Sequence, residues 1–534
     1  MSAKKSSSRR QPDPMRLEIF KNIFHSIADE MGAALRRSAF SPNIKERRDY
    51  SCAIYDASGE VLAMGDHMPV HLGSMPASVA STRAELAFEP GDIALLNDPF
   101  AGGTHLPDLT LVAPVFVISG KTPQFFVASR AHHADIGGAL AGSMGPAREI
   151  FQEGLRIPAV KILQKGSLQR DVMTLLLANV RTPTEREGDL AAQIASCCLG
   201  ERRLREINAK YGLSEVVQYA GHLLDYSEKM MRAVIATLRP GIYRADDFLD
   251  SDGVSDHRLR LRVAIRIRSD RAVVDFTGSA PQCAGNVNAV EAIAVSAVYY
   301  VFRCLVPEDV PATSGLLRPI KIVAPRGTIV NAMPPAAVAG GNVETSQRMV
   351  DTLLRALARA APNKIPAASQ GTMNNLTFGG ANSLRDGQAF TYYETVAGGC
   401  GASATGNGAS ATHSHMTNSW NTPTEVLEAT YPVRLKRYAI RKRSGGGGVY
   451  RGGEGVVREF EFLSPVDVGL LTERRKTAPY GLAGGGDGSN GRNTLTRNGK
   501  LIALPAKCSF AAKPGDILGV ETPGGGGWGR KRKR

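Results

Sequence analysis

The sequence has little cysteine and no long apolar run. Seven cysteines are scattered through 534 residues, and no two are spaced as Cys-X-X-Cys. An odd number without that spacing excludes a disulfide framework and a zinc ribbon, and it indicates a reducing, cytoplasmic environment. No stretch is long and apolar enough for a membrane-spanning helix. The first residues lack the apolar segment of a secretory signal, so we expect a protein without membrane association.

Phosphate-binding loops are also missing, although the chain has 57 glycines. None of the glycine-rich stretches has the GxxxxGK[S/T] spacing. None places GxGxxG between a strand and a helix. The chain therefore has no recognised device of its own for binding ATP. The glycine-rich stretches after residue 370 predict loops whose backbone can approach another surface closely.

Positive charge is concentrated at the two ends of the chain. The net charge is +15, of which residues 1–16 carry +4 and residues 530–534 carry +5. Such tails could attach to nucleic acid, but the rest of the chain has no basic face interleaved with aromatic residues. We interpret residues 1–14 and 530–534 as disordered, solvated tails, so nucleic acid is not an expected partner.

The hydrophobic patterns predict a multi-lobed α+β protein, because 534 residues exceed one ordinary core. An amphipathic helix is expected at 16–38, a hairpin at 50–64 and strands near 92–132. Further helices are expected within 170–240, at 285–306 and at 344–361. At 257–279 apolar and basic residues alternate with a period of two, which predicts strands whose arginine side chains face solvent. The expected lobes are an N-terminal metal-site and helical lobe at 15–240, a middle α/β lobe at 241–370 and a glycine-rich β lobe at 371–529.

Histidine and aspartate gather in two short stretches, "GGTHLPDLT" and "RAHHADIGG". The first holds His105 and Asp108 and the second holds His132 and His133, so three of the ten histidines lie here. A hairpin between the two stretches would bring residue 132 beside residue 105. Neighbouring residues of a strand point to opposite faces, so His132 and His133 are not expected to act together. Asp49 starts another predicted strand.

Two imidazoles and two carboxylates form a mixed nitrogen and oxygen set. Such a set suits Zn²⁺, Mn²⁺ or Fe²⁺ and is too rich in nitrogen for Ca²⁺. A metal held there could lower the pKa of a bound water or polarise an oxygen atom. Spacing alone leaves open the alternative that these are polar loop residues that form hydrogen bonds within turns.

Many ordered stretches of the chain resemble one family. From about Met15 to Gly529 the sequence is similar to the hydantoinase B family. That family includes the B-type chain of ATP-dependent N-methylhydantoinase, the beta chain of caprolactamase, the C-terminal half of 5-oxoprolinase and the alpha chain of acetone carboxylase. The stretches that carry the resemblance are "SPNIKERRDYSCAIYD", "NDPFAGGTHLPDLTLVAPVF", "RAHHADIGG", "NVRTPTEREGDL", "DFTGSAPQCAGNVNA", "GGNVETSQR", "HMTNSWNTPTEVLE", "RSGGGGVYRGGEGV" and "TPGGGGWG".

The resemblance implies both a site and a reaction. Family members hold a divalent metal at positions matching Asp49, His105, Asp108 and His132, with His133 as the alternate. They work with a hydantoinase A-type partner, an actin-like ATPase that phosphorylates the substrate. The expected protein is therefore the B-type component of an ATP-dependent cyclic amidase that hydrolyses the activated C–N bond within a hetero-oligomer. The alternatives are the alpha chain of an acetone or aryl-ketone carboxylase and a non-catalytic scaffold.

Other polar residues are weaker candidates. His71, His413 and His415 are interpreted as hydrogen-bonded structural histidines. Cys400 has no activating base that the sequence can place beside it and is interpreted as a small buried residue. Asn407 stands where the family commonly has aspartate, which leaves the substrate open. Three glutamates near glycine-rich loops could orient a substrate: Glu344, Glu394 and Glu425.

Overall fold

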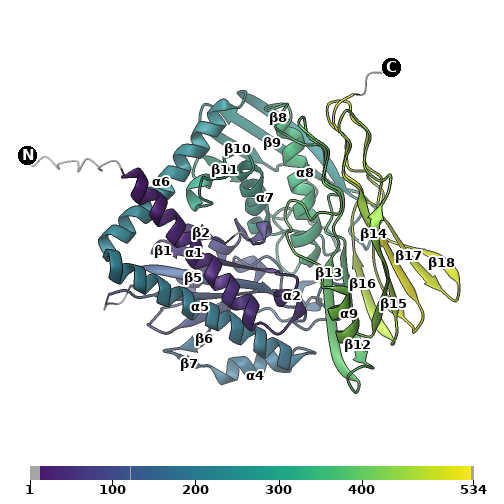
Figure 1. Ribbon diagram of the computed structural model, residues 1–534, viewed down its shortest axis with the longest axis horizontal. Helices are drawn as coiled ribbons and strands as arrows, with labels where there is room; N and C mark the ends of the chain where they lie inside the picture. The colour runs from purple at the N-terminus through teal and green to yellow at the C-terminus, as the bar shows by residue number, and fades with distance from the viewer. Residues whose placement is uncertain (1–11, 66, 119, 121, 531–534) are drawn as a thin grey trace, which may run out of the picture.

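The computed structural model describes residues 12–65, 67–118, 120 and 122–530, and it mixes helices with sheets (Figure 1). This confirms the α+β class. The helices are α1 Pro14–Ser38, α2 Pro42–Lys45, α3 Met75–Glu85, α4 Arg170–Ala178, α5 Pro183–Tyr211, α6 Leu213–Thr237, α7 Glu291–Arg303, α8 Ser346–Leu357 and α9 Thr424–Thr430. Single turns are η1 Pro69–His71, η2 Pro99–Ala101, η3 Ile150–Gln152, η4 Ser314–Leu317 and the π-helical η5 Gly341–Thr345.

Helix α1 shows how local sequence sets an element. Pro14 occupies the first turn, where its missing N–H costs nothing, and the Asp13 carboxylate accepts a hydrogen bond from the Met15 amide at 2.9 Å. Arg36 and Arg37 lie in the last turn, where positive charge complements the helix dipole. The predicted apolar face is buried, confirming the helix expected at 16–38.

A seven-stranded antiparallel sheet forms the centre of the N-terminal part. Its strand order is β2-β1-β5-β4-β3-β6-β7. Alternate residues of β4 enter two different cores: Leu111 packs on the side of α1 and α5, and Val112 packs on the side of α3. In Figure 1, α1 and α5 cross one face of this sheet. The strands are β1 Tyr50–Asp56, β2 Val61–Met64, β3 Ile93–Leu96, β4 Asp108–Val115, β5 Phe125–His132, β6 Val160–Gln164 and β7 Ser167–Leu168.

A second sheet and the helices α6, α7 and α8 form the middle part. Its order is β11-β10-β9-β8, with β8 Gly241–Leu249, β9 Leu259–Arg268, β10 Arg271–Asp275 and β11 Ile320–Val323. Arg266 and Arg268 are exposed on β9, as the alternating pattern predicts. One hydrophobic cluster runs from Phe20 to Leu471 and crosses the expected boundaries at 240 and 370. Those boundaries stay a prediction about folding units.

The helix expected at 285–306 is shorter than predicted. Helix α7 begins only at Glu291. The segment before it is irregular because the Asn288 amide donates to the carbonyl oxygens of Gly285 and Ala337 at 2.8 and 3.1 Å. Those bonds hold the chain in a loop. Short polar side chains such as that of asparagine can form hydrogen bonds with backbone groups that compete with helix formation.

The C-terminal part is built from two further sheets, which lie at one side of the molecule in Figure 1. Their orders are β13-β12-β16-β19 and β14-β15-β20-β17-β18. A separate aromatic and aliphatic core fills the space between them. The strands are β12 Asn375–Asn382, β13 Gln388–Thr395, β14 Val433–Arg441, β15 Gly455–Phe462, β16 Val466–Leu471, β17 Arg492–Arg497, β18 Lys500–Leu504, β19 Lys507–Ala512 and β20 Ile517–Glu521.

The glycine-rich stretches approach one another. The Gly446 amide donates to Gly525 O at 2.8 Å, the Gly525 amide to Gly453 O at 2.9 Å, and the Gly453 amide to Cys400 O at 2.8 Å. A Cβ added at Gly525 would lie 2.0 Å from Cys400 O, so no side chain fits there. The close backbone approach predicted from composition is therefore made between segments of the same chain.

The expected tails fall mostly outside the described residues. Residues 1–11 and 531–534 are not described, while Pro14 already belongs to α1. None of the helices in the described ranges is long and apolar enough to cross a membrane.

Candidate metal centre

Two neighbouring strands bring His105, Asp108 and His132 together. Asp108 begins β4, His132 ends β5, and the two are register partners in the antiparallel pair. His105 precedes β4 in a loop that starts at Gly102, where φ is +93°. A Cβ at Gly102 would lie 2.4 Å from Ala77 O, so glycine lets the loop press against α3.

The three side chains converge on one point. His105 Nε2 lies 3.0 Å from Asp108 Oδ1, and His132 Nδ1 lies 3.4 Å from the same oxygen. One ligand atom of each residue lies within 4.8 Å of those of the other two. All three residues are at most 2% exposed. We refer to His105, Asp108 and His132 as the His–Asp–His cluster.

The donor chemistry of the His–Asp–His cluster fits a divalent metal. His105 Nδ1 and His132 Nε2 are buried and have no hydrogen-bond partner among the described residues. Each is the ring nitrogen that does not face Asp108 Oδ1, and since buried polar atoms are normally satisfied, both are features to explain. Two imidazole nitrogens and a carboxylate oxygen form a set that suits Zn²⁺, Mn²⁺ or Fe²⁺.

Electrostatics favour an ionised Asp108 and a neutral His132. Burial alone would raise the pKa of Asp108, but the charge of His105 and hydrogen bonds from His105, His132 and His71 hold it well below its usual range. Burial lowers the pKa of His132, although its hydrogen bond to Asp108 opposes this. The result is an ionised carboxylate beside a neutral imidazole, both of which bind cations.

Asp49 adjoins the His–Asp–His cluster, but it is not one of the three residues whose ligand atoms lie within 4.8 Å of one another. Its backbone oxygen accepts a hydrogen bond from the His132 amide at 3.0 Å. Burial raises the pKa of the Asp49 carboxyl, and the nearby charges of His132 and Arg47 oppose that rise. The Asp49 carboxyl interacts electrostatically with His132, Asp108 and His105, so its role as a fourth ligand stays a prediction.

His133 faces away from the His–Asp–His cluster. Its Nε2 lies 2.9 Å from Gln193 Oε1, on the opposite side of the strand end. Strand alternation predicts this separation, and it favours His132 over His133 as the ligand. His71, interpreted from the sequence as a structural histidine, places its Nε2 3.4 Å from Asp108 Oδ2. His71 therefore helps to orient the carboxylate.

Contacts from distant segments complete the surroundings. The Thr104 hydroxyl donates to Asp108 Oδ2 at 2.7 Å. Tyr393 stacks on His132 with ring centroids 4.4 Å apart. Asn342 Nδ2 lies 3.1 Å from His105 Nε2. No sequence spacing indicates the last two, because they are more than 200 residues away from their partners along the chain.

A match to a protein-family model shows the family of this chain. The model described as Hydantoinase B/oxoprolinase matches residues 13–531. The chain belongs to the hydantoinase B/oxoprolinase family. The resemblance seen in the sequence is thereby confirmed.

Relatives of this hydantoinase B/oxoprolinase chain differ in length. An uncharacterized protein of Methanocaldococcus jannaschii is 39% identical, and the match covers 98% of this chain and 92% of that protein. 5-Oxoprolinase 1 of Arabidopsis thaliana is 40% identical over 97% of this chain. The match spans only 42% of that enzyme and 42% of the 5-oxoprolinase of Saccharomyces cerevisiae, which is also 40% identical.

Two solved structures share the fold. The ATP-dependent caprolactamase from Pseudomonas jessenii has a TM-score of 0.90 and 28% identity, over 98% of this chain and 92% of that one. Nucleotide-free acetone carboxylase also has a TM-score of 0.90, with 20% identity over 99% of this chain and 78% of that one, and supports the fold alone.

The weaker candidate residues of this hydantoinase B/oxoprolinase chain lie outside the His–Asp–His cluster, and several of them contact other side chains. His415 Nε2 lies 3.4 Å from Asp351 Oδ1, and Glu394 forms a buried pair with Arg458 at 2.7 Å. Burial raises the pKa of the Cys400 thiol, which does not favour a nucleophile. The remaining four are His413, whose buried ring nitrogens have no partner in the described part of the chain, Glu425, exposed on α9, Asn407, which accepts from the Arg451 amide, and Glu344, buried beside Asn375.

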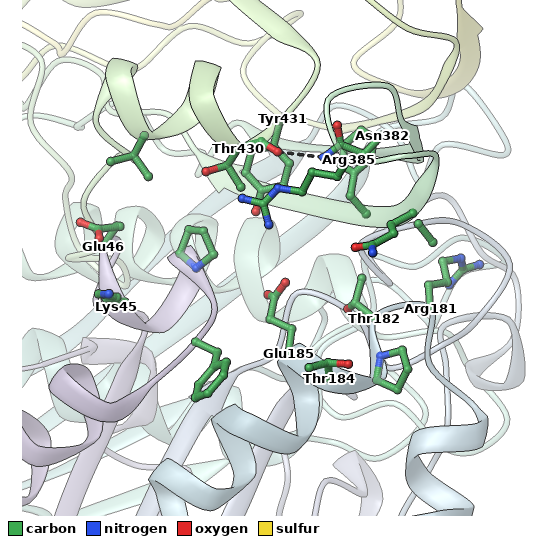
Figure 2. Close-up of a pocket in the computed structure, with 17 residues that line it drawn as sticks. Lys45, Glu46, Arg181, Thr182, Thr184, Glu185, Asn382, Arg385, Thr430 and Tyr431 are labelled. Atoms are coloured by element: carbon green, nitrogen blue, oxygen red, sulfur yellow. Dashed lines mark hydrogen bonds between the residues drawn. The ribbon is translucent and has the colours of Figure 1, made fainter.

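A separate cleft of about 760 Å³ opens between the N-terminal and C-terminal parts (Figure 2). Lys45 and Glu46 lie at the end of α2 on one wall, and Arg385 comes from the β12–β13 turn on the other. Glu185 and Arg385 point into the space between the walls. The lining contains no member of the His–Asp–His cluster. The candidate metal ligands therefore lie outside this cleft.

Proposed function

We propose that this chain is the metal-binding B-type component of an ATP-dependent cyclic amidase, which hydrolyses the C–N bond of a substrate activated by an A-type ATPase partner. The observation that carries the proposal is the buried His–Asp–His cluster, in which His105 Nε2 and His132 Nδ1 face the same carboxylate oxygen of Asp108. His105, Asp108 and His132 would hold the metal, with Asp49 as the fourth ligand. Names of relatives, 5-oxoprolinase and ATP-dependent caprolactamase, support the substrate class.

The residues around the cluster would orient its ligands. A bound divalent ion would supply an activated water or polarise the oxygen of the substrate. Thr104 and His71 hold one oxygen of Asp108, which leaves the other directed at the imidazoles. The Asn43 amide donates to the backbone oxygen of His132 at 2.6 Å and fixes the end of β5. Such outer contacts set the orientation of the ligands and tune the metal.

ATP would be used on another polypeptide. The sequence has no recognised phosphate loop, whereas the 5-oxoprolinases are more than twice as long as the region matched. We infer that the additional residues of those enzymes perform the ATP-dependent step that an A-type partner would perform for this chain. Phosphorylating the amide oxygen would give an imidate phosphate without amide resonance. Water adds to its carbon, and departure of the protonated ring nitrogen breaks the C–N bond and leaves an acyl phosphate. A second water then releases inorganic phosphate and the ring-opened acid.

Co-expression with a hydantoinase A-type partner tests the proposal. The complex would be assayed with ATP and with 5-oxoproline, hydantoin or caprolactam, measuring ADP and ring-opened product. We expect ATP-dependent ring opening of at least one substrate, abolished by His105→Ala. Turnover of a ketone that requires bicarbonate would favour the carboxylase alternative instead. ATP hydrolysis by the partner with no product from any substrate would leave only a scaffold role.

A further inference from the structure

A π-helical turn approaches the His–Asp–His cluster from the middle of the chain. All five residues of η5, Gly341–Thr345, are buried. The Gly341 amide donates to Asn286 O at 3.1 Å, and a Cβ at Gly341 would lie only 1.8 Å from Asn288 O. The turn is thus pressed against another backbone segment. π-Helical turns are rare and occur frequently at functional sites.

The turn directs the Asn342 amide at His105. Asn342 is 4% exposed, and its Nδ2 lies 3.1 Å from His105 Nε2. The same nitrogen of His105 lies 3.0 Å from Asp108 Oδ1. Asn342 therefore stands about as close to His105 as the carboxylate does, although 237 residues separate the two along the chain.

These separations match those of ligands on one ion. Bonds of about 2.0–2.2 Å from a metal to nitrogen or oxygen place two ligand atoms at a right angle about 3 Å apart. The amide of Asn342 satisfies this spacing with His105. Its oxygen, Oδ1, is buried and has no partner among the described residues. Rotation of the amide by half a turn exchanges its oxygen and nitrogen, so the oxygen can occupy the position beside His105.

We propose that Asn342 is a further metal ligand, which binds the ion of the His–Asp–His cluster through its amide oxygen. The inference rests on the proposed function only in requiring that the cluster binds a divalent metal. With Asp49, the set becomes two imidazoles, two carboxylates and one neutral amide. Oxygen-rich sets of five ligands suit ions that take five or six ligands, such as Mn²⁺, better than four-coordinate Zn²⁺.

Metal affinity of three variants tests this ligand without any activity assay. Asn342→Leu removes the amide at nearly constant volume, and Asn342→Asp restores an oxygen ligand at the same place. Asn286→Leu is the matched control, because Asn286 is another buried amide packed on η5 but donates to Gly145 O at 2.9 Å. Mn²⁺ and Zn²⁺ would be titrated into metal-stripped full-length protein by calorimetry.

Asn342→Leu is expected to weaken Mn²⁺ binding by at least about tenfold and Zn²⁺ binding much less, since four ligands already satisfy zinc. Asn342→Asp is expected to bind Mn²⁺ at least as tightly as wild type, and Asn286→Leu should match wild type. Equal losses for both metals in Asn342→Leu, or no loss for either, would overturn the assignment. A wild-type protein that binds neither metal would contradict the proposed metal function itself and this ligand with it.

Discussion

At the scale of single residues, the sequence indicates part of the candidate centre. His105 and Asp108 are three positions apart around a proline, and a strand pair returning His132 beside them follows from the alternating pattern. Strand alternation predicts that His132 and His133 do not act together, and the resemblance to the hydantoinase B family points to His132. Asn342 and Tyr393 could not be predicted, because their contacts depend on how distant segments pack and not on any local spacing.

A buried carboxyl next to η5 gives a prediction about pH. Glu153 is 2% exposed and accepts hydrogen bonds from the amides of Ala339 and Val338 at 2.9 and 3.1 Å. Burial raises the pKa of this carboxyl to about 8, although the two amides oppose the rise. The neutral form is favoured in the folded chain. Its contribution to stability is therefore complete below the ordinary pKa and is lost as pH rises through about 8.

Glu153→Gln removes this titration while keeping a similar shape. We expect wild type to lose stability relative to Glu153→Gln as pH rises from about 5 to about 9, the window that the raised pKa defines. The midpoint of thermal unfolding, measured for both proteins across that range, checks this. A difference in midpoint that stays constant with pH would show that Glu153 does not titrate in this way.

At the scale of elements, periodic patterns predict the helices and strands well, and irregular segments poorly. The apolar face of α1 and the alternation of β9 are local properties of the sequence, so they can be recognised. The loop before α7 cannot, because Asn288 is held by carbonyl groups that only the folded chain brings near. Composition predicts that the glycine-rich segments approach some surface closely, but it cannot name that surface.

Two neighbouring glycines test the packing of these segments. A Cβ at Gly446 would lie 2.2 Å from Gly486 O, whereas a Cβ at Gly447 would meet nothing within 4 Å. We expect Gly446→Ala to lower the free energy of unfolding by about 1–3 kcal/mol, as overpacking does. Gly447→Ala should change it by less than about 1 kcal/mol. Urea unfolding of both variants measures the difference, and equal effects would contradict the backbone packing described.

At the scale of the whole molecule, the centre is assembled from distant parts of the chain. The cluster comes from the N-terminal sheet, Asn342 from the turn before α8 and Tyr393 from β13. A buried ion pair between Arg474 and Asp351 at 2.6 Å joins the C-terminal part to α8. A metal bound at this junction would favour the folded state alone. Metal content therefore reports on the complete fold as well as on the ligands.

The most direct test of the account is the metal content of purified protein, measured by plasma mass spectrometry. Wild type would be compared with His105→Ala and with His133→Ala, the neighbouring histidine that faces Gln193. We predict about one divalent ion per chain in wild type and in His133→Ala, and none in His105→Ala. Metal-free wild type from metal-replete medium, or equal metal in all three proteins, would contradict the central claim that the His–Asp–His cluster is a metal centre.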